Sequence, residues 1–192
     1  STEWKRQNYR KPEQQRWYAG ESISVAVGQG YNSFTVLQLA HATAVLASNG
    51  IVRPPHLVTQ TLSPHDPEIE QPVRIDAKLI PLKQANVDVV KRALVDVVRL
   101  GTARRAFAGA AYQAAGKTVT AQVFSLRGAK YNANAIDERL RDHALFMSYA
   151  PAENPKIAVA LIVENAGWGG SVAAPIVRKV FDYWLVERGQ MQ

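Results

Sequence analysis

The chain has 192 residues, of which 47% are apolar and 20% are charged, a composition that predicts a folded core and argues against intrinsic disorder. It has no cysteine, which excludes disulfides, thiolate metal ligands and cysteine catalysis. The net charge of +7 favours anionic partners, but the basic residues are scattered as on an ordinary solvated surface, and no apolar run reaches the roughly 18 residues that a bilayer-crossing helix needs.

The first residues show neither an initiator methionine nor a signal-peptide pattern, so we expect a piece of a longer protein. Residues 1–20 are polar and aromatic without clear periodicity, which predicts a surface loop. Residues 22–27 alternate polar and apolar side chains before a glycine-rich break. A helix is predicted from Ser33 or Thr35 to Asn49, because apolar residues recur at helical spacing, a hydroxyl can cap its start and Gly50 suits a left-handed end.

The next stretch is predicted to be extended and then irregular. Residues 51–61 fit a partial edge strand interrupted by two prolines, and residues 62–81 carry four more prolines, which predicts a long exposed loop. A second helix is predicted from Asn86 to Arg99, with Asn86 as its cap and Gly101 at its end. A short helical turn over residues 102–108 should follow.

The last third of the sequence predicts three strands and a helix. The strands cover residues 113–124, 143–150 and 156–164, with a tight hairpin between the second and the third. The third strand is apolar on both faces, which is typical of a central strand. Residues 173–187 form an amphipathic helix. Helices followed by an antiparallel sheet and a returning helix predict an α+β fold, with the sheet flanked by helices.

The first of these strands carries the candidate chemistry in Lys117, Thr118, Val119 and Thr120. Alternation along a strand places Lys117 and Val119 on one face and the two threonines on the other. A strand at the border of a groove can still present all of them to a ligand that lies along its edge. The ammonium would then supply positive potential and the hydroxyls would bind a carboxylate. An ordinary exposed strand is the alternative for an isolated Lys-Thr-x-Thr pattern.

Other candidate motifs favour structural roles. The Gly28–Gly30 segment lacks the third glycine and the Lys-Ser/Thr of a phosphate-binding loop, so we interpret it as a turn. The four histidines show no zinc-site spacing, and no Gly-x-Ser-x-Gly elbow occurs. Residues 137–142 alternate in charge, as in a solvated turn, and His143 after them is expected to cap or pair structurally. Residues 167–170 fit either a flexible rim around a site or a plain connection.

Four blocks in this order resemble the C-terminal part of the transpeptidase domain of class B penicillin-binding proteins. They are SVAVGQGY (24–31) with TVLQLA (35–40), GKTVTAQVF (116–124), ERLRDHALF (138–146) with YAP (149–151), and AVALIVEN (158–165) with GG (169–170) and AAPI (173–176). The resemblance covers nearly the whole chain. The third block favours the elongation-specific penicillin-binding protein 2 type of Gram-negative bacteria.

The resemblance implies a penicillin-binding protein/serine β-lactamase-like fold and a peptidoglycan D,D-transpeptidase without metal or cofactor. A serine attacks the D-Ala-D-Ala bond of a stem peptide, and the amine of a neighbouring peptide resolves the acyl-enzyme. β-Lactam antibiotics mimic that dipeptide. Lys117 would be the lysine of the Lys-Thr-Gly signature, and Thr118 and Thr120 would bind the terminal carboxylate. The N–H of Thr120 would form part of the oxyanion hole, and Gln122 would contribute to substrate binding.

The sequence departs from the family pattern in two ways. It contains no Ser-x-x-Lys or Ser-x-Asn in a recognisable context, so the nucleophile is not in this chain and the segment alone is expected to be inactive. Val119 stands where the signature has glycine. Glycine lets a ligand approach the strand backbone, whereas an isopropyl group crowds that approach.

Two other functions stay open at this point. The missing nucleophile and Val119 favour a non-catalytic binding module that retains the transpeptidase fold. The positive charge alone motivates nucleic-acid binding, which the scattered distribution disfavours. For the leading hypothesis, the resemblance implies the periplasmic face of the inner membrane, with an anchor outside this chain. It also implies four partners, with no nucleic acid among them: the missing N-terminal half of the domain, stem peptides, β-lactam antibiotics and membrane proteins of the elongation complex.

Overall fold

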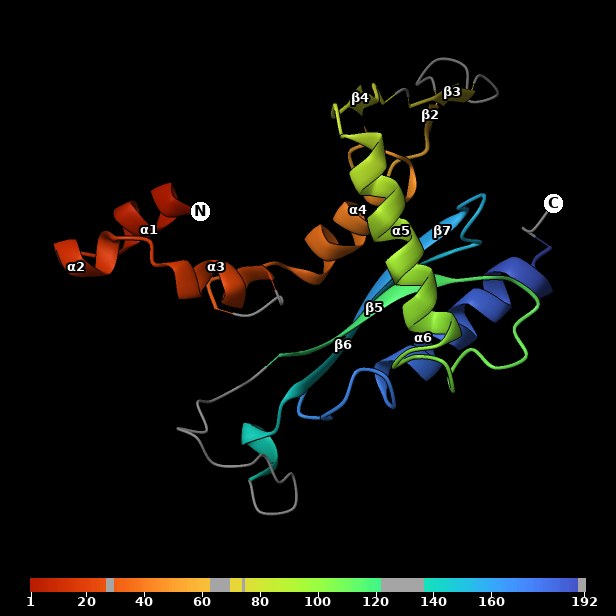
Figure 1. Ribbon diagram of the computed structural model, residues 1–192. Helices are drawn as coiled ribbons and strands as arrows, with labels where there is room; N and C mark the ends of the chain where they lie inside the picture. Colours follow the sequence, from red (N-terminus) through yellow and green to blue (C-terminus); the bar gives the residue numbers. More distant parts are fainter. Residues whose placement is uncertain (27–29, 63–69, 74, 122–136, 190–192) are drawn as a thin grey trace. The chain divides into compact units, whose positions relative to one another are not determined.

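The computed structural model describes residues 1–26, 30–62, 70–73, 75–121 and 137–189 (Figure 1). The chain divides into two compact units, Ser1–Phe34 and Thr35–Gln192, each with its own internal packing. In the described part of the chain, no helix is both long and apolar enough to cross a membrane.

The N-terminal unit consists of three short helices, α1 (Thr2–Asn8), α2 (Pro12–Gln15) and α3 (Ala19–Ala26). The Ser1 side chain caps α1 by accepting a hydrogen bond from the Trp4 amide at 3.1 Å, and Pro12 begins α2, where its missing N–H costs nothing. The prediction of a loop over residues 1–20 is therefore wrong. Helices of seven, four and eight residues are too short to show clear periodicity in the sequence.

A buried lysine holds this unit together. Lys5 is only 2% exposed, and its ammonium forms an ion pair with Glu21 and donates to the carbonyl oxygen of Arg16 at 2.6 Å. The Glu21 carboxylate also accepts from the Tyr31 hydroxyl at 2.9 Å and from the Tyr18 amide at 2.8 Å. The rings of Tyr18 and Tyr31 lie 5.2 and 5.3 Å from the ammonium. The charge is therefore buried with partners on several sides, as burial of a charge requires.

The Lys5–Glu21 pair makes this unit sensitive to pH at both extremes. Burial is the largest single influence on Lys5 and opposes its charged form, but the hydrogen bonds and charges of Glu21 and Tyr31 together outweigh it, so the pKa of Lys5 lies above its usual 10.5. The hydrogen bond from Lys5 is the main reason that the pKa of Glu21 lies below its usual 4.5. The stabilisation from Glu21 is complete above pH 4.5 and is lost as the pH falls through the lowered pKa of Glu21. The stabilisation from Lys5 is complete below pH 10.5 and is lost as the pH rises through the raised pKa of Lys5.

We therefore expect amide hydrogen exchange over residues 1–34, corrected for intrinsic rates, to accelerate as the pH falls below 4.5. Glu21→Gln should raise exchange at neutral pH and remove most of this acid dependence, because the amide cannot carry the charge that Lys5 needs. Glu3→Gln, at an exposed position of α1, is the matched control. An unchanged exchange profile in Glu21→Gln would show that the ion pair does not stabilise the unit.

The second unit is built on a three-stranded antiparallel sheet in the order β5-β6-β7. The strands are β5 (Ala115–Ala121), β6 (His143–Ala150) and β7 (Ile157–Val163), which confirms the three predicted strands. Within the described residues β5 ends at Ala121, and predicted strand residues 122–124 lie outside them.

β7 occupies a different position from the one that its sequence predicts. Its seven residues are apolar, yet in the described residues it is an edge strand and all seven side chains are only half-buried. A central strand is therefore wrong within the described part of the chain. The apolar edge of β7 remains open to pairing with a further strand.

Three longer helices cover the sheet: α4 (Val36–Ala47), α5 (Gln84–Arg99) and α6 (Ala173–Phe181), the last continuing as a π-helical segment, Asp182–Glu187. α4 begins with a capping box in which Gln38 N donates to the Thr35 hydroxyl at 3.2 Å and Thr35 N donates to the Gln38 side chain at 2.9 Å.

The ends of these helices differ in part from prediction. Gly50 follows α4 with φ of +96°, which confirms the left-handed end, and Asn49 before it also has positive φ. The N-cap of α5 is Lys83, without a side-chain hydrogen bond, and Asn86 lies inside the first turn. The prediction of Asn86 as a cap is wrong because the helix starts at Gln84, two residues before Asn86 and ahead of its apolar stripe.

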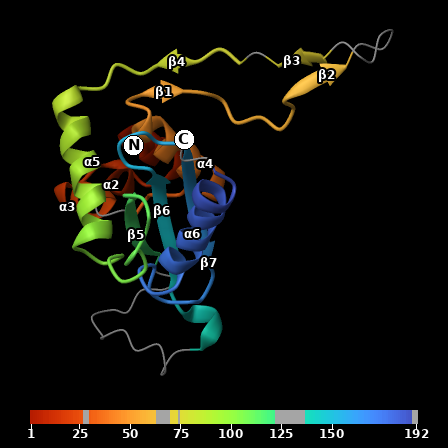
Figure 2. The same ribbon diagram turned by 90° about the vertical axis from the view of Figure 1, so that its right-hand side faces the viewer.

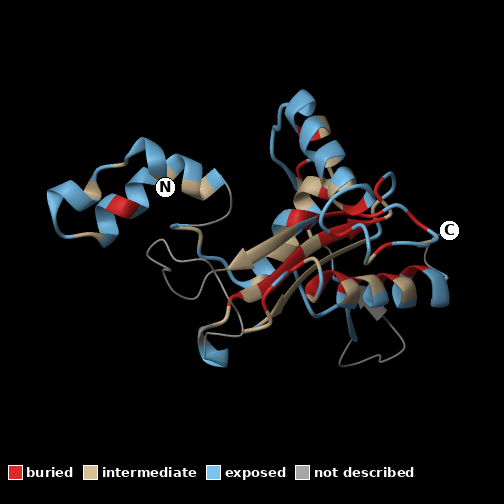
Figure 3. Ribbon diagram, turned by 60° about the horizontal axis from the view of Figure 1, so that its bottom comes forward, coloured by how far each residue is buried: buried red, intermediate tan, exposed pale blue. Residues whose placement is uncertain are grey.

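The helices lie on both faces of the sheet. α6 packs on β6 and β7, α4 packs on the same two strands from the other side, and α5 packs along β5. Figure 2 shows α5 and α6 on opposite sides of the strands, and Figure 3 shows the buried residues gathered along the strands and the inner side of α6. The larger core lies on the α6 face, where the ring centroids of Phe107 lie 5.9 Å from Phe146 and 6.3 Å from Phe181.

The segment between α4 and α5 contains short strands. β1 (Ile51–Val52) pairs with β4 (Lys78–Leu79), and β2 (Gln60–Leu62) pairs with β3 (Glu70–Pro72). The stretch predicted as an exposed loop over residues 62–81 thus carries two strands, while residues 63–69 and 74 lie outside the described residues. Strands of two or three residues are too short to show the alternation of polar and apolar side chains from which a strand is predicted.

Candidate functional site

The candidate strand, β5, is covered at its start and open at its end. Ala115 is buried on the side that α5 covers and Gly116 is buried as well, whereas Lys117 is exposed and the residues from Thr118 to Ala121 are half-buried. Among the described residues β5 is also an edge strand of its sheet. The part of the strand that carries the Lys-Thr-x-Thr pattern therefore lies on an accessible edge, where an extended ligand can lie along the backbone.

The glycine before Lys117 is required by packing. A Cβ at Gly116 would lie 2.6 Å from Cζ of Phe146 and 2.8 Å from the carbonyl oxygen of Met147, both on the neighbouring strand. The Phe146 ring thus covers Gly116 directly. This contact fixes the point at which β5 leaves the core and its side chains become accessible.

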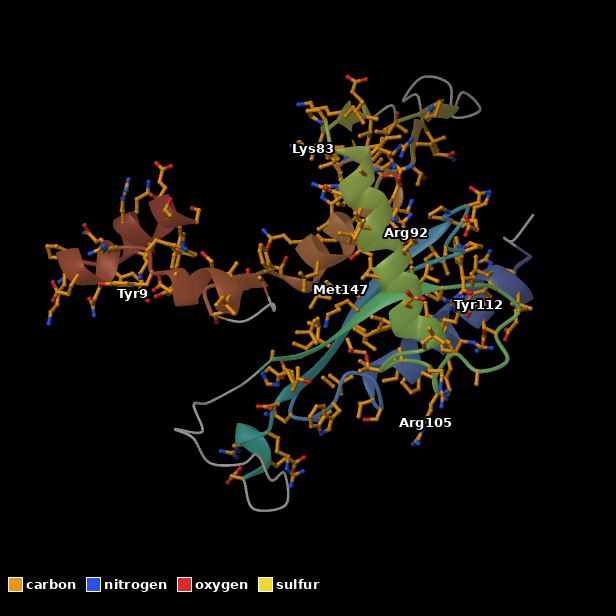
Figure 4. All side chains as sticks on the ribbon, in the orientation of Figure 1. Tyr9, Lys83, Arg92, Arg105, Tyr112 and Met147 are labelled. Carbon is orange, nitrogen blue, oxygen red and sulfur yellow. The ribbon has the colours of Figure 1, made fainter. Side chains whose placement is uncertain are left out.

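The register of β5 on β6 shows which way the candidate side chains point. Lys117 pairs with Met147, labelled in Figure 4, and Val119 pairs with Leu145, on the face that α4 and α5 cover. Thr118 pairs with Phe146 and Thr120 pairs with Ala144, and both pairs lie on the α6 face. Directly paired residues of antiparallel strands share a face, so the predicted division of these side chains is observed.

The polar groups of Lys117 and Thr118 have specific contacts. The Lys117 ammonium donates to the carbonyl oxygen of Thr118 at 2.5 Å, and among the described residues it has no acidic partner. The Thr118 hydroxyl oxygen lies 2.7 Å from that of Thr102, in the turn that follows α5. The strand edge therefore carries an exposed positive charge beside an ordered pair of hydroxyls, an arrangement that suits an anion.

The loop after β7 packs on the same strand. A Cβ at Gly169 would lie 2.8 Å from the carbonyl oxygen of Val119 and 2.3 Å from that of Leu145. A Cβ at Gly170 would lie 2.5 Å from the carbonyl oxygen of Thr102. The two glycines thus permit a contact between backbones that any side chain would prevent. This contact favours the interpretation of residues 167–170 as part of the site's surroundings, whereas a plain connection would not need it.

The remaining predicted residues fall outside this arrangement. Gln122 lies outside the described residues, so the structure does not place it. His143 accepts a hydrogen bond from the Asn165 amide at 2.9 Å through Nδ1, a structural tie between the start of β6 and the end of β7. No group of three or more His, Asp or Glu side chains is arranged to hold a metal in the part of the chain that the structure describes.

Sequence analysis did not identify Thr102 or the backbone contact of Gly169 and Gly170 as parts of the site. Thr102 is 16 residues from Thr118, and the two meet only because α5 returns the chain beside β5. The only signal in the sequence was the Gly101–Thr102 step at the predicted helix end, which indicates a turn but no partner.

Three cavities of about 510, 500 and 510 Å³ lie elsewhere in the second unit. The first lies between α5 and the β6–β7 hairpin and includes Tyr149, whose buried hydroxyl has no hydrogen-bond partner in the described part of the chain. Burial, with a smaller contribution from Glu153, raises the pKa of Tyr149 to about 12. Residues 117–120 line none of these three cavities. In the described residues the candidate site is thus an open strand edge, which needs a second wall to become a cleft.

Comparisons with known proteins agree with this architecture. Residues 5–182 match the family model described as the penicillin-binding protein transpeptidase domain. The peptidoglycan D,D-transpeptidase MrdA of Haemophilus influenzae is 44% identical over 97% of this chain, and that of Escherichia coli K12 is 37% identical over 96%. This chain spans only 28% and 29% of the length of these two proteins.

Solved structures show the same similarity. The crystal structure of Pseudomonas aeruginosa PBP2 in complex with WCK 5153 matches 97% of this chain at 41% identity with a TM-score of 0.72, and the match covers 37% of that protein. The fold is therefore the α+β fold of penicillin-binding protein transpeptidase domains, in part. The chain belongs to the penicillin-binding protein transpeptidase family and is of the penicillin-binding protein 2 type within class B.

Proposed function

We propose that this chain is the substrate-edge part of a peptidoglycan D,D-transpeptidase, contained in a longer parent protein whose other half supplies the nucleophilic serine. The observation that carries the proposal is the accessible half of β5, where an exposed ammonium, which has no acidic partner among the described residues, lies beside two threonines. In the proposed reaction, the serine attacks the D-Ala-D-Ala carbonyl and releases D-alanine. The amine of a second stem peptide then attacks the resulting ester and regenerates the serine.

Each residue of the strand has a distinct role in this proposal. Lys117 supplies positive potential for the terminal carboxylate of the substrate. The Thr118 and Thr120 hydroxyls donate hydrogen bonds to that carboxylate, and the backbone N–H of Thr120 stabilises the oxyanion of the tetrahedral intermediate. Gln122 is proposed to extend the binding surface. None of these steps uses a metal or cofactor.

The open edge of β7 supports the proposal that another part of the parent protein completes the sheet. β7 is apolar along its whole length and half-buried throughout, so pairing with a further strand would cover surface that is unfavourable in water. The same missing part is proposed to form the second wall of the cleft beside β5. Because the proposed substrate is peptidoglycan, we further propose that the parent protein acts at the periplasmic face of the inner membrane with elongation-complex membrane proteins.

A labelled β-lactam tests the proposed function directly. The parent protein should acquire one covalent label per molecule, which unlabelled penicillin prevents and denaturation of the protein beforehand abolishes. The alternative, a non-catalytic binding module, is favoured by Val119 at the glycine position of the signature. It predicts no covalent label, so an unlabelled parent protein would contradict the transpeptidase proposal and support the module.

The effect of Val119 itself can be measured in the same assay. Val119 is half-buried opposite Leu145, on the same face as Lys117. Replacing it by glycine should increase the acylation rate of the parent protein by roughly tenfold, which corresponds to ~1.4 kcal/mol of barrier, because the ligand can approach the backbone more closely. The same change should also lower stability, by more than the about 0.5–1 kcal/mol that glycine costs relative to alanine in a strand, because the half-buried isopropyl group is lost as well.

Ala121→Gly is the matched control, because it introduces glycine on the same strand and face two residues further on. It should share the part of the stability loss that glycine causes in a strand, without the gain in acylation. Equal acylation rates for Val119 and its glycine variant would show that the isopropyl group does not hinder the ligand.

A further inference from the structure

Thr102 and Thr118 form a contact that the family signature does not explain. Their hydroxyl oxygens lie 2.7 Å apart, which is normal for a hydrogen bond between two hydroxyls. Thr102 belongs to the turn after α5, whereas Thr118 lies on β5, so the bond joins two separate elements. Thr102 is exposed and Thr118 is half-buried, so the pair lies at the surface, where a ligand can reach it.

The backbone around Thr102 is held on both sides. Gly101 donates to the carbonyl oxygen of Asp96 at 2.9 Å, and a Cβ at Gly101 would lie 2.9 Å from Cα of Val97. On the other side Ala103 is fully buried and donates to the carbonyl oxygen of Val97 at 3.1 Å. The turn is thus anchored to the last turn of α5, and the position of the Thr102 hydroxyl is set before any ligand arrives.

Thr118 is held by two further contacts. The Lys117 ammonium donates to its carbonyl oxygen, and its methyl carbon would lie 3.6 Å from a Cβ at Gly170, an ordinary packing distance. The same glycine packs closely on the carbonyl oxygen of Thr102. The loop after β7 therefore packs against both threonines and restricts how far the two hydroxyls can separate.

We propose that Thr102 is a positioning residue that directs the hydroxyl hydrogen of Thr118 toward the carboxylate of the ligand. Each hydroxyl has one hydrogen to donate, and only one of the two can donate in the bond between them. A carboxylate only accepts, so Thr118 must use its hydrogen on the ligand, and the hydrogen between the threonines must come from Thr102. Accepting this bond also strengthens the donation by Thr118. The inference rests on the proposed function of β5.

The test compares Thr102→Val and Thr102→Ser in the parent protein with two ligands. One is penicillin, which carries the ring carboxylate, and the other is its methyl ester, which does not. Thr102→Val should lower the acylation efficiency with penicillin by about tenfold, mainly through weaker binding, because a hydrogen bond to a charged group is lost or misdirected. The ester should change by less than about twofold, and Thr102→Ser, which keeps the hydroxyl, should stay within about threefold of the parent with both ligands.

A double-mutant cycle with Thr118→Val provides the control for coupling. Thr102→Val should cause no further loss in a protein that already lacks the Thr118 hydroxyl. Equal losses with penicillin and ester, additive losses in the cycle, or no loss in Thr102→Val would each overturn the inference. Thr102→Ala gives a second variant without the hydroxyl should the valine variant fold poorly. A parent protein that penicillin does not label would overturn the proposed function as well, whereas a labelled parent with an unaffected Thr102→Val would overturn this inference alone.

Discussion

Replacing Lys117 by methionine in the parent protein is expected to lower the rate of acylation by a labelled penicillin by roughly 10²–10³-fold, the usual effect of removing one fixed group that stabilises charge in an active site. The ammonium is exposed at the open half of β5 and has no acidic partner among the described residues. Its charge is therefore available to the ligand. Methionine keeps most of the length of the side chain and removes only the charge and its hydrogen bonds.

Lys156→Met is the matched control, because Lys156 is an exposed lysine on the β6–β7 hairpin, away from β5. It changes the net charge of the protein by the same amount and should leave acylation within about twofold, since exposed charges beyond a Debye length are screened. Rates for Lys117→Met within a few-fold of the parent would show that this lysine is not part of the reaction site. Thermal unfolding of both variants separates this effect from loss of fold.

Replacing Phe146 by alanine is expected to destabilise the second unit by about 3–5 kcal/mol, the usual cost of deleting a buried aromatic ring. Phe146 is fully buried between β5, the Phe107 ring and the rest of the α6-side core. Its ring also covers Gly116, so its loss leaves a cavity directly beneath the point where β5 emerges. The urea midpoint of the transition that involves this unit should fall in proportion.

Phe34→Ala is the control for the loss of a phenylalanine, because Phe34 is 61% exposed. It should change stability by no more than about 0.5 kcal/mol. The Phe146 variant should also lose acylation activity, since β5 would lose its support. A Phe146→Ala protein with an unchanged unfolding midpoint would contradict the assignment of this ring to the core.

The local pattern of the second unit was sufficient to predict most of its elements. The boundaries of β6 agree with the predicted 143–150, and α4 lies within its predicted range because periodicity, a capping hydroxyl and Gly50 all act locally. The three helices of residues 1–26 escaped prediction because their stabilisation is not local. They depend on Lys5 meeting Glu21, 16 residues away, with aromatic rings around the pair.

The candidate site, too, could be predicted from the sequence only in part. The alternation of side chains along a strand already placed Lys117 opposite in direction to Thr118, and the cross-strand register agrees with it. What the alternation could not show was that the packing of helices on the sheet buries the first residues of β5 and leaves Lys117 exposed. The extent of that burial depends on how the helices pack on the sheet.

The sequence by itself therefore determined the strands of the sheet, the direction of each β5 side chain and the family of the protein, because these follow from residue order and short-range sterics. Only the tertiary structure decided that Thr102 meets Thr118, that Gly169 and Gly170 lie against the strand backbone, and that β7 is at an edge within the described residues. Contacts of this kind join segments 16 to more than 50 residues apart, and the packing of helices and loops on the sheet brings them together.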